Sequence, residues 1–288
     1  MLERMPEAAE IAAHMKRIFG RSVAEAAVLD KGWLNVKWRM ETEQGPVFVK
    51  YYHPDRYKLH ARPERRSDIE RTLRLQHELN IGGVPCPNVH AANGRFLQET
   101  PSGLFYTVQD WIEGQPAQAG CLNTAQMHSL GLATGRMHKR LRAVPPLGAP
   151  VWRPDKARYV EEWEGNWNKA RQADDGIAAE WLERSRRLVE AIDFGLFDSF
   201  RPAWLHWDLW VDNLLLNDEG VAGILDFDEA PPGMPARAML MLYLVESIWW
   251  LRTEIRAEMG LKDLLRRFVE ELHWIEDNRD TLAEQLPR

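Results

Sequence analysis

The sequence predicts an α+β fold in which a small, strand-rich part precedes a larger helical part. In the first third of the chain, runs of alternating apolar and polar residues lie between turn signals, as expected of half-buried strands. From about residue 120 onward, most segments have the composition and spacing of helices. The chain has 288 residues, so one large domain or two lobes are expected. We place the lobes at residues 1–113 and 114–288, with a link near 110–120.

In the first lobe, residues 1–20 have the pattern of an amphipathic helix that ends near Gly20. Residues 23–53 contain three expected strands, two of which flank the turn signal at 43–46. The segment 64–83 is expected to form a helix, because its apolar residues recur at i,i+4 spacing, and Gly82 and Gly83 are expected to end it. Short strands are expected within 84–90, 94–100 and 103–114.

In the second lobe, helices are expected over 124–141, 157–173 and 177–192, and again from residue 236 onward. The longest apolar run, at 238–245, is far too short to span a membrane. The N-terminal segment lacks the basic and apolar regions of a secretion signal. Cys86 and Cys121 have neither metal-ligand spacing nor a disulfide pattern. We therefore expect a soluble, cytoplasmic protein.

The charge of the chain disfavours one class of partner. Its formal net charge is −6, from 37 basic and 43 acidic residues. Proteins that bind nucleic acids without sequence preference normally carry an excess of lysine and arginine, which this composition lacks. A phosphate-bearing small ligand remains compatible, because a few local donors suffice to bind it. We expect neither nucleic acid nor membrane as a partner, and the sequence leaves the oligomeric state open.

Polar residues interrupt an apolar stretch at 205–216, where His206, Asp208 and Asn213 occur among tryptophans and leucines. A second interruption, Asp226, follows a short β-type run. The turn signal at 217–220 favours a hairpin that brings Asn213 and Asp226 to the same end of two antiparallel strands. Such a set suits metal-assisted phosphoryl transfer, in which one carboxylate orients the attacking hydroxyl. An amide oxygen and a second carboxylate would then bind Mg²⁺.

These residues resemble the His-x-Asp-x4-Asn and Ile-Asp-Phe motifs of aminoglycoside phosphotransferases and choline kinases, small-molecule relatives of the protein kinases. The resemblance covers roughly residues 25 to 250 and implies a protein-kinase-like, two-lobe fold. It implies that Asp208 is the catalytic base and that Asn213 and Asp226 are Mg²⁺ ligands. His206 would brace the catalytic loop. The short sequence from Asp208 to Asn213 is also similar to that of fructosamine kinases.

The same resemblance extends to the first lobe and implies a site for ATP. Lys50 corresponds to the lysine that binds the nucleotide phosphates, and the turn from Gly32 to Asn35 would cover them. An acidic residue of the following helix should pair with Lys50, and we select Glu70. Asp68 and Glu78 are the alternatives. The backbone of Gln109 to Trp111 would contact the adenine.

The sequence departs from the family pattern at Trp207, which stands in place of a glycine, and at Met234 and Ala238. An aspartate that braces the catalytic loop is expected at one of the latter positions. We predict a kinase dependent on ATP and Mg²⁺ that phosphorylates a hydroxyl of a small molecule. Aminoglycoside-, choline-, sugar- and homoserine-like acceptors all remain open. The alternative is a catalytically weak or inactive nucleotide-binding module with a regulatory or scaffolding role.

Overall fold

The structure of the chain is a computed structural model. It describes residues 5–29, 35–118, 121–145, 156–172, 203–206, 208–227 and 232–233, with a few single positions between 176 and 278. The chain forms two compact units, one of Met1–Pro145 with Trp204–Pro231 and one of Pro146–Ala203 with Pro232–Arg288. The lobe boundary expected between residues 113 and 114 falls inside the first unit and stays a prediction.

An antiparallel sheet with the strand order β1-β2-β3-β5-β4 dominates the first unit. Its strands are β1 (Val23–Val28), β2 (Val36–Thr42), β3 (Gly45–Tyr52), β4 (Gln98–Glu99) and β5 (Phe105–Asp110). The three strands expected within residues 23–53 are confirmed. The two-residue turn between β2 and β3 fixes their register, in which Thr42 lies opposite Gly45 and Lys37 lies opposite Lys50.

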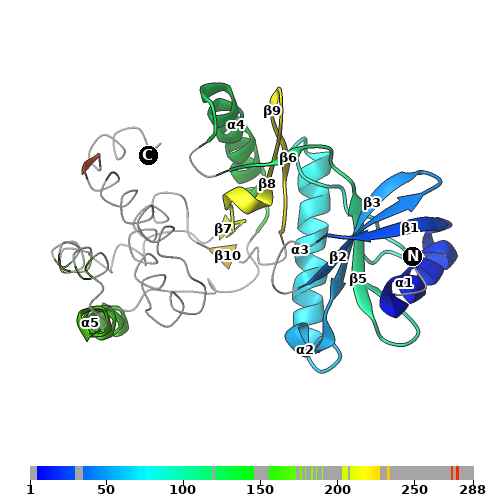
Figure 1. Cartoon of the computed structure of the whole chain (residues 1–288), viewed down its shortest axis with the longest axis horizontal. Coiled ribbons are helices and arrows are strands. Elements are labelled where there is room, and N and C mark those ends of the chain that lie inside the picture. Colours follow the sequence, from blue (N-terminus) through cyan, green and yellow to red (C-terminus); the bar gives the residue numbers. More distant parts are fainter. Residues whose placement is uncertain are drawn as a thin grey trace. The chain divides into compact units, whose positions relative to one another are not determined.

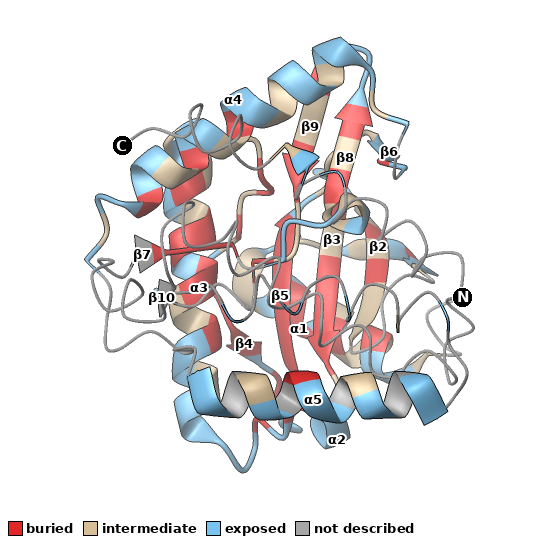
Figure 2. Cartoon of the chain, turned by 90° about the vertical axis from the view of Figure 1, so that its left-hand side faces the viewer, coloured by how far each residue is buried: buried red, intermediate tan, exposed pale blue. Residues whose placement is uncertain are grey.

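The two faces of this sheet have different neighbours, and Figure 1 shows helices α1 (Pro6–Phe19) and α3 (Pro63–Ile81) on opposite sides of it. The face toward α1 is apolar, and its core contains Ile11 and Met15 of α1 with Val49 and Val108 of the sheet. The other face carries Lys50 and Gln109, because side chains alternate along a strand. Most residues of β3 and β5 are buried (Figure 2).

Helix ends follow the sequence signals. Helix α1 ends at Gly20, whose φ of 68° is accessible to glycine. The short helix α2 (Pro54–Tyr57) precedes α3, and α3 ends before Gly82 and Gly83 as expected. Helix α4 (Thr124–Leu141) matches the predicted range and begins with a capping box formed by Asn123 and Gln126.

A second sheet joins the segment after β5 to a hairpin further along the chain. Its order is β6-β8-β9, with β6 (Gln115–Pro116), β8 (Leu214–Asn217) and β9 (Gly220–Ile224). The Oδ1 atom of Asn217 accepts hydrogen bonds from the amides of Glu219 and Gly220, which stabilises the predicted turn. The hairpin packs with α3 and α4 around Leu79, Met137 and Ile224.

One expected strand is absent from the described structure. Residues 84–90 form only an isolated bridge at Val89, because Pro85 and Pro87 have no amide hydrogen for a ladder. Their carbonyl groups are used instead. The amide of Ile224 donates to Pro85 O at 2.8 Å, and Gln76 Nε2 donates to Pro87 O at 2.8 Å. The segment thereby connects α3 to the hairpin.

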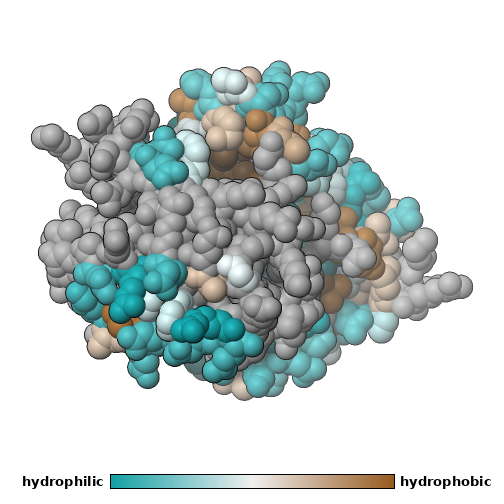
Figure 3. Space-filling view, turned by 60° about the vertical axis from the view of Figure 1, so that its left-hand side comes forward, coloured by the Kyte–Doolittle hydropathy of each residue, from teal (hydrophilic) through white to brown (hydrophobic). Residues whose placement is uncertain are grey.

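The remaining described elements are short or isolated: the 3₁₀ turn Val211–Asn213, β7 (Ala203–Trp204), β10 (Pro232–Gly233) and helix α5 (Lys156–Gln172). Helix α5 confirms the helix expected over 157–173. The helices expected over 177–192 and from 236 onward lie essentially outside the described residues. On the face drawn in Figure 3, hydrophilic residues cover most of the described surface. Among the described helices, none combines the length and apolar character needed to cross a membrane.

Candidate active site

The buried ring of His206 connects the predicted catalytic loop at Asp208 to the end of the β8–β9 hairpin. Its Nε2 atom is 2.8 Å from Leu225 O, and the amide of Asp208 donates to its Nδ1 atom at 3.3 Å. A carbonyl accepts and an amide donates, so both bonds require the neutral ring with its hydrogen on Nε2. Burial, the main cause, lowers the pKa of His206 against smaller opposing effects that include the Leu225 carbonyl. The ring also packs edge-on against Phe227.

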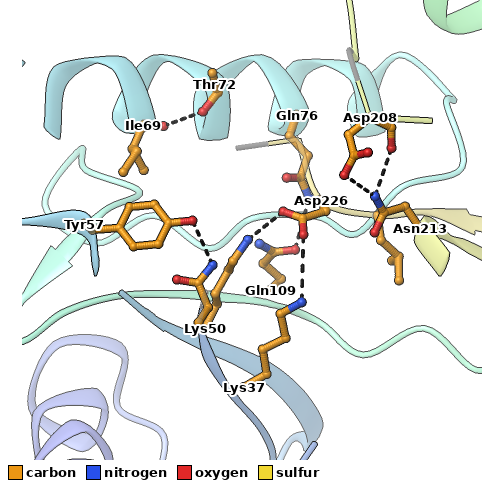
Figure 4. Close-up of polar contacts among 12 residues, drawn as sticks. Lys37, Lys50, Tyr57, Ile69, Thr72, Gln76, Gln109, Asp208, Asn213 and Asp226 are labelled. Atoms are coloured by element: carbon orange, nitrogen blue, oxygen red, sulfur yellow. Dashed lines mark hydrogen bonds and ion pairs between the residues drawn. The ribbon is translucent and has the colours of Figure 1, made fainter. Parts of the chain in front are cut away.

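Asp208 lies at the surface, and Asn213 orients it. Asn213 Nδ2 donates to Asp208 O at 2.9 Å and to Asp208 Oδ2 at 2.8 Å. The Val211–Asn213 turn places the two residues close together (Figure 4). Because Asp208 is exposed and only its Oδ2 atom accepts from Asn213, the carboxylate can receive the proton of an approaching hydroxyl.

Asp226 lies just beyond the end of β9, next to Asn213. The amide of Leu225 donates to Asn213 O at 2.8 Å, so the hairpin brings the two predicted metal ligands to one end of its strands. Asp226 has a φ of 62°, which aspartate tolerates better than most residues because its short side chain can hydrogen-bond locally. Such strained positions cluster at functional sites.

Two lysines from the first sheet point toward Asp226 (Figure 4). Lys50 Nζ donates to Asp226 Oδ1 at 2.7 Å, and Lys37 Nζ is 3.8 Å from Asp226 Oδ2. The Lys50 side chain is 3% exposed, so it is fixed within the structure. Burial of Asp226 raises its pKa, but the charge and hydrogen bond of Lys50, together with the charge of Lys37, outweigh this effect and lower the pKa.

The expected pairing of Glu70 with Lys50 is wrong for this structure. Glu70 instead accepts hydrogen bonds from the amides of Phe96 and Leu97, at distances from 2.8 to 3.1 Å. The described carboxylate that Lys50 contacts is Asp226. The sequence could not reveal this, because Glu70 reaches a loop that only the fold brings to α3. Asp68, one of the two alternatives, is exposed and binds Arg71.

The other predicted nucleotide-binding residues lie near or beside the sheet. Asn35 Nδ2 donates to Tyr57 OH at 3.1 Å, and Gly32 lies outside the described residues. Gln109 is buried within the ladder, where its Oε1 atom accepts from Gln76 Nε2 at 3.1 Å. Trp111 follows the last residue of β5, and its half-buried ring packs beneath the guanidinium of Arg39. Their roles in binding a nucleotide stay predictions.

Close glycine contacts hold the segment after β5 against the hairpin. A Cβ on Gly114 would lie 3.1 Å from both Leu215 Cβ and Leu216 O. A Cβ on Gly223 would lie 2.9 Å from Ile112 Cδ1. The two glycines thus allow the chain that follows Trp111 to lie directly on β8, which begins after Asn213, and on β9, which ends two residues before Asp226.

The oxygen atoms present fit a magnesium ion better than a transition metal. No cluster of three or more His, Cys, Asp or Glu side chains that could hold a metal occurs among the described residues. Asn213 and Asp226 offer an amide oxygen and a carboxylate, and the Nδ2 bonds of Asn213 leave its Oδ1 for a cation. Mg²⁺ is commonly bound by one or two protein oxygens, with water and substrate phosphates as its other ligands.

Lys37 is the charged site residue that the sequence interpretation missed. A signal for it exists, because counting back from the turn at 43–44 places Lys37 directly opposite Lys50. The hydrogen bond between the buried side-chain amides of Gln76 and Gln109 could not be predicted either, because the two residues are 33 positions apart.

The sheet with its adjoining helices, the lysine–aspartate pair and the exposed loop aspartate together define a kinase-like α+β protein. Comparison with known families agrees: residues 25–279 match the model of the phosphotransferase enzyme family. The chain belongs to this family.

Individual relatives are distant. The homoserine kinase of Mesorhizobium japonicum is 26% identical over 212 residues, which cover 68% of this chain and 57% of that protein. The chain thus spans little more than half the length of the curated relatives it matches. A spectinomycin phosphotransferase in complex with ADP and spectinomycin has a TM-score of 0.50 at 14% identity, covering 94% of this chain and 85% of that one. A macrolide 2'-phosphotransferase from Brachybacterium faecium has a TM-score of 0.51 at 17% identity, covering 93% and 89%.

Proposed function

We propose that this protein transfers the γ-phosphate of ATP, with Mg²⁺, to a hydroxyl group of a small molecule. The observation that carries this proposal is the arrangement around one hairpin. Asp226, at its end, binds the buried Lys50, while the neighbouring Asn213 orients the exposed Asp208. Phosphoryl transfer needs positioning and charge stabilisation of this kind, and the protein need form no covalent intermediate.

Asp208 has the role of the base in this proposal. Its exposed carboxylate accepts the hydrogen bond of the acceptor hydroxyl and takes the proton as the oxygen attacks the γ-phosphorus. The bond between the γ-phosphorus and the bridging oxygen breaks in the same transfer, and ADP leaves. The bond from Asn213 Nδ2 to Oδ2 fixes the direction of the carboxylate. His206 has a positioning role, because its ring binds the Asp208 amide and the Leu225 carbonyl and does not touch the substrate.

Lys50 and Asp226 have the role of the nucleotide-binding pair. The ammonium group of Lys50 lies on a central strand with almost no exposure, so its charge remains at a fixed place for the α- and β-phosphates. Asn213 and Asp226 would hold Mg²⁺, which neutralises charge on the phosphates when bound. Trp111 and the backbone around it follow the strand that carries Gln109, where an adenine would lie.

The acceptor is a hydroxyl-bearing small molecule whose class the proposal leaves wide. The likeness to a homoserine kinase favours an amino-alcohol acceptor as a first candidate, and aminoglycosides, choline-like alcohols and sugars follow. A panel of such acceptors is therefore the proper test.

The experiment is ADP release by the purified protein with Mg-ATP and a panel of aminoglycosides, choline, ethanolamine, homoserine, methylthioribose and fructosamines. The Asp208→Ala variant is the control, with thermal shift by Mg-ATP recorded for both proteins. The proposal predicts turnover with at least one acceptor, its loss in the variant and an unchanged nucleotide shift. Undiminished turnover in the variant would remove Asp208 from its role. A thermal shift without turnover on a widened panel would favour the non-catalytic nucleotide-binding alternative.

A further inference from the structure

A second lysine lies beside Lys50 on the site-facing side of the sheet. Lys37 in β2 is directly opposite Lys50 in β3 in the antiparallel register. Residues opposite each other in this way point to the same face, with Cβ atoms about 4.5–5.5 Å apart. Figure 4 shows both side chains reaching toward Asp226. Like charges placed directly opposite one another destabilise a sheet, so the pair implies an anion on this face.

Asp226 supplies part of that negative charge to both lysines. Its Oδ1 atom is 2.7 Å from Lys50 Nζ, and its Oδ2 atom is 3.8 Å from Lys37 Nζ. Helix α3 contributes neutral groups here, since its buried polar side chains are Thr72 and Gln76. In many kinases a helix glutamate would approach the strand lysine. Here Glu70 is bound to a loop instead.

A divalent cation and the lysines would compete for the same carboxylate. If Asp226 binds a metal, as the proposed function requires, both lysines lose the share of negative charge that this carboxylate supplies. The polyphosphate that arrives with the metal is the anion that can replace it. We propose that Lys37 is a second phosphate-binding lysine, which contacts the nucleotide polyphosphate beside Lys50. This inference rests on the proposed function and deepens it.

The two lysines differ in how tightly the structure holds them. The Lys50 side chain is 3% exposed and makes a short hydrogen bond, whereas the Lys37 side chain is 18% exposed and lies at ion-pair distance. Lys37 also follows Asn35 by two residues, at the end of the turn expected to cover the phosphates. Lys37 therefore contributes affinity for the phosphates of the nucleotide. Lys50 is held by its own burial and hydrogen bond, so its position does not depend on Lys37.

The test is calorimetric titration of the full chain with Mg-ATP, Mg-ADP and adenosine. The proteins are the wild type, Lys37→Met, Lys37→Arg and the charge-matched control Lys16→Met, which changes an exposed residue of α1. Loss of one charged hydrogen bond should weaken Mg-ATP binding roughly tenfold. Mg-ADP should be affected less and adenosine hardly at all. Lys37→Arg should retain most of the affinity, and Lys16→Met should match the wild type.

The outcomes separate the inference from the function on which it rests. Equal Mg-ATP affinity in Lys37→Met and the wild type would overturn the role of Lys37 alone. An equal loss for adenosine and Mg-ATP would also overturn it, because it would reveal a structural effect. A wild type that binds none of the three ligands would overturn the proposed function, and the inference with it.

Discussion

Lys50 and Asp208 are both charged residues of the candidate site, yet the protein holds them in opposite ways. Lys50 is buried in a central strand and bonds a carboxylate 176 positions away in sequence. Asp208 is exposed, and its side chain is bound by Asn213, five positions away. The first arrangement depends on the whole tertiary fold, and the second depends on one local turn.

This difference indicates which part of the site should tolerate change. A lysine fixed by tertiary contacts is preorganised before any ligand arrives, so its charge costs little to orient. An exposed carboxylate on a turn depends on its immediate braces, which are Asn213 at the side and His206 below. Substitution of Asp208 should therefore affect turnover, whereas substitution of the buried His206 that holds its loop should affect the free energy of unfolding.

The largest expected effect is that of Asp208→Asn. The neutral amide cannot take the hydroxyl proton, so kcat should fall by roughly 10²- to 10⁴-fold. Affinity for Mg-ATP should change little, because Asp208 contacts the acceptor. ADP release and calorimetry measure the two quantities. The matched control is Asp212→Asn, an exposed neighbour, and a similar fall in that variant would show that loop charge in general is responsible.

His206→Ala should reduce the free energy of unfolding by about 2–4 kcal/mol, measured in urea. The change removes the hydrogen bond to Leu225 O, the acceptor of the Asp208 amide and the packing against Phe227. The control His128→Ala alters an exposed residue of α4 and should be near neutral. A neutral His206→Ala would contradict the bracing role.

The same histidine predicts a pH dependence. Because burial lowers its pKa in the folded state, the unfolded chain binds the proton first as the pH falls. The stability that the neutral ring contributes is therefore complete above about pH 6.5, the unfolded value, and declines as the pH falls toward the lower folded pKa. His206→Ala should flatten this decline in unfolding curves. An unchanged slope would mean that other groups cause it.

Glu70→Gln separates the observed contact from the expected one. Replacement of the carboxylate leaves one oxygen for the amides of Phe96 and Leu97, so the free energy of unfolding should fall by about 1–2 kcal/mol. Mg-ATP affinity should stay within a few-fold of the wild type. A large loss of nucleotide affinity with unchanged stability would instead support a pairing of Glu70 with Lys50 in the nucleotide complex.

The last comparison concerns two glycines, and one of them gives the smallest expected effect. Gly114→Ala places a methyl group against Leu215 and the Leu216 carbonyl, and the backbone must shift, which costs about 1–2 kcal/mol. Gly131→Ala in α4 meets nothing within 4 Å and should stabilise the helix by roughly 0.5–1 kcal/mol. Thermal unfolding of both variants gives the comparison. Equal shifts would contradict the close packing after β5.

Much of the fold was predictable because its signals are local. Turn residues fixed the β2–β3 and β8–β9 hairpins, and glycines fixed the ends of α1 and α3. The proximity of Asn213 and Asp226 followed from the second hairpin. Lys37 was also predictable by register, because the β2–β3 turn places it opposite Lys50.

Contacts between distant segments were not predictable in the same way. Glu70 was misassigned because a helix carboxylate can meet a strand lysine or a loop amide, and sequence spacing does not distinguish them. Pro85 and Pro87 excluded a full strand, yet their use as acceptors for Ile224 and Gln76 depends on tertiary packing. Trp207, Met234 and Ala238, where the sequence departs from the family pattern, lie outside the described residues.

The most direct test of the account is titration of ATP into the wild type and Asp226→Asn, each with and without Mg²⁺. The control is Asp218→Asn, an exposed residue of the β8–β9 turn. If Asp226 joins the metal to the lysine-bound phosphates, Mg²⁺ should strengthen ATP binding in the wild type and the control but not in Asp226→Asn. An equal Mg²⁺ effect in all three proteins would contradict the central claim that Asp226 organises the nucleotide site.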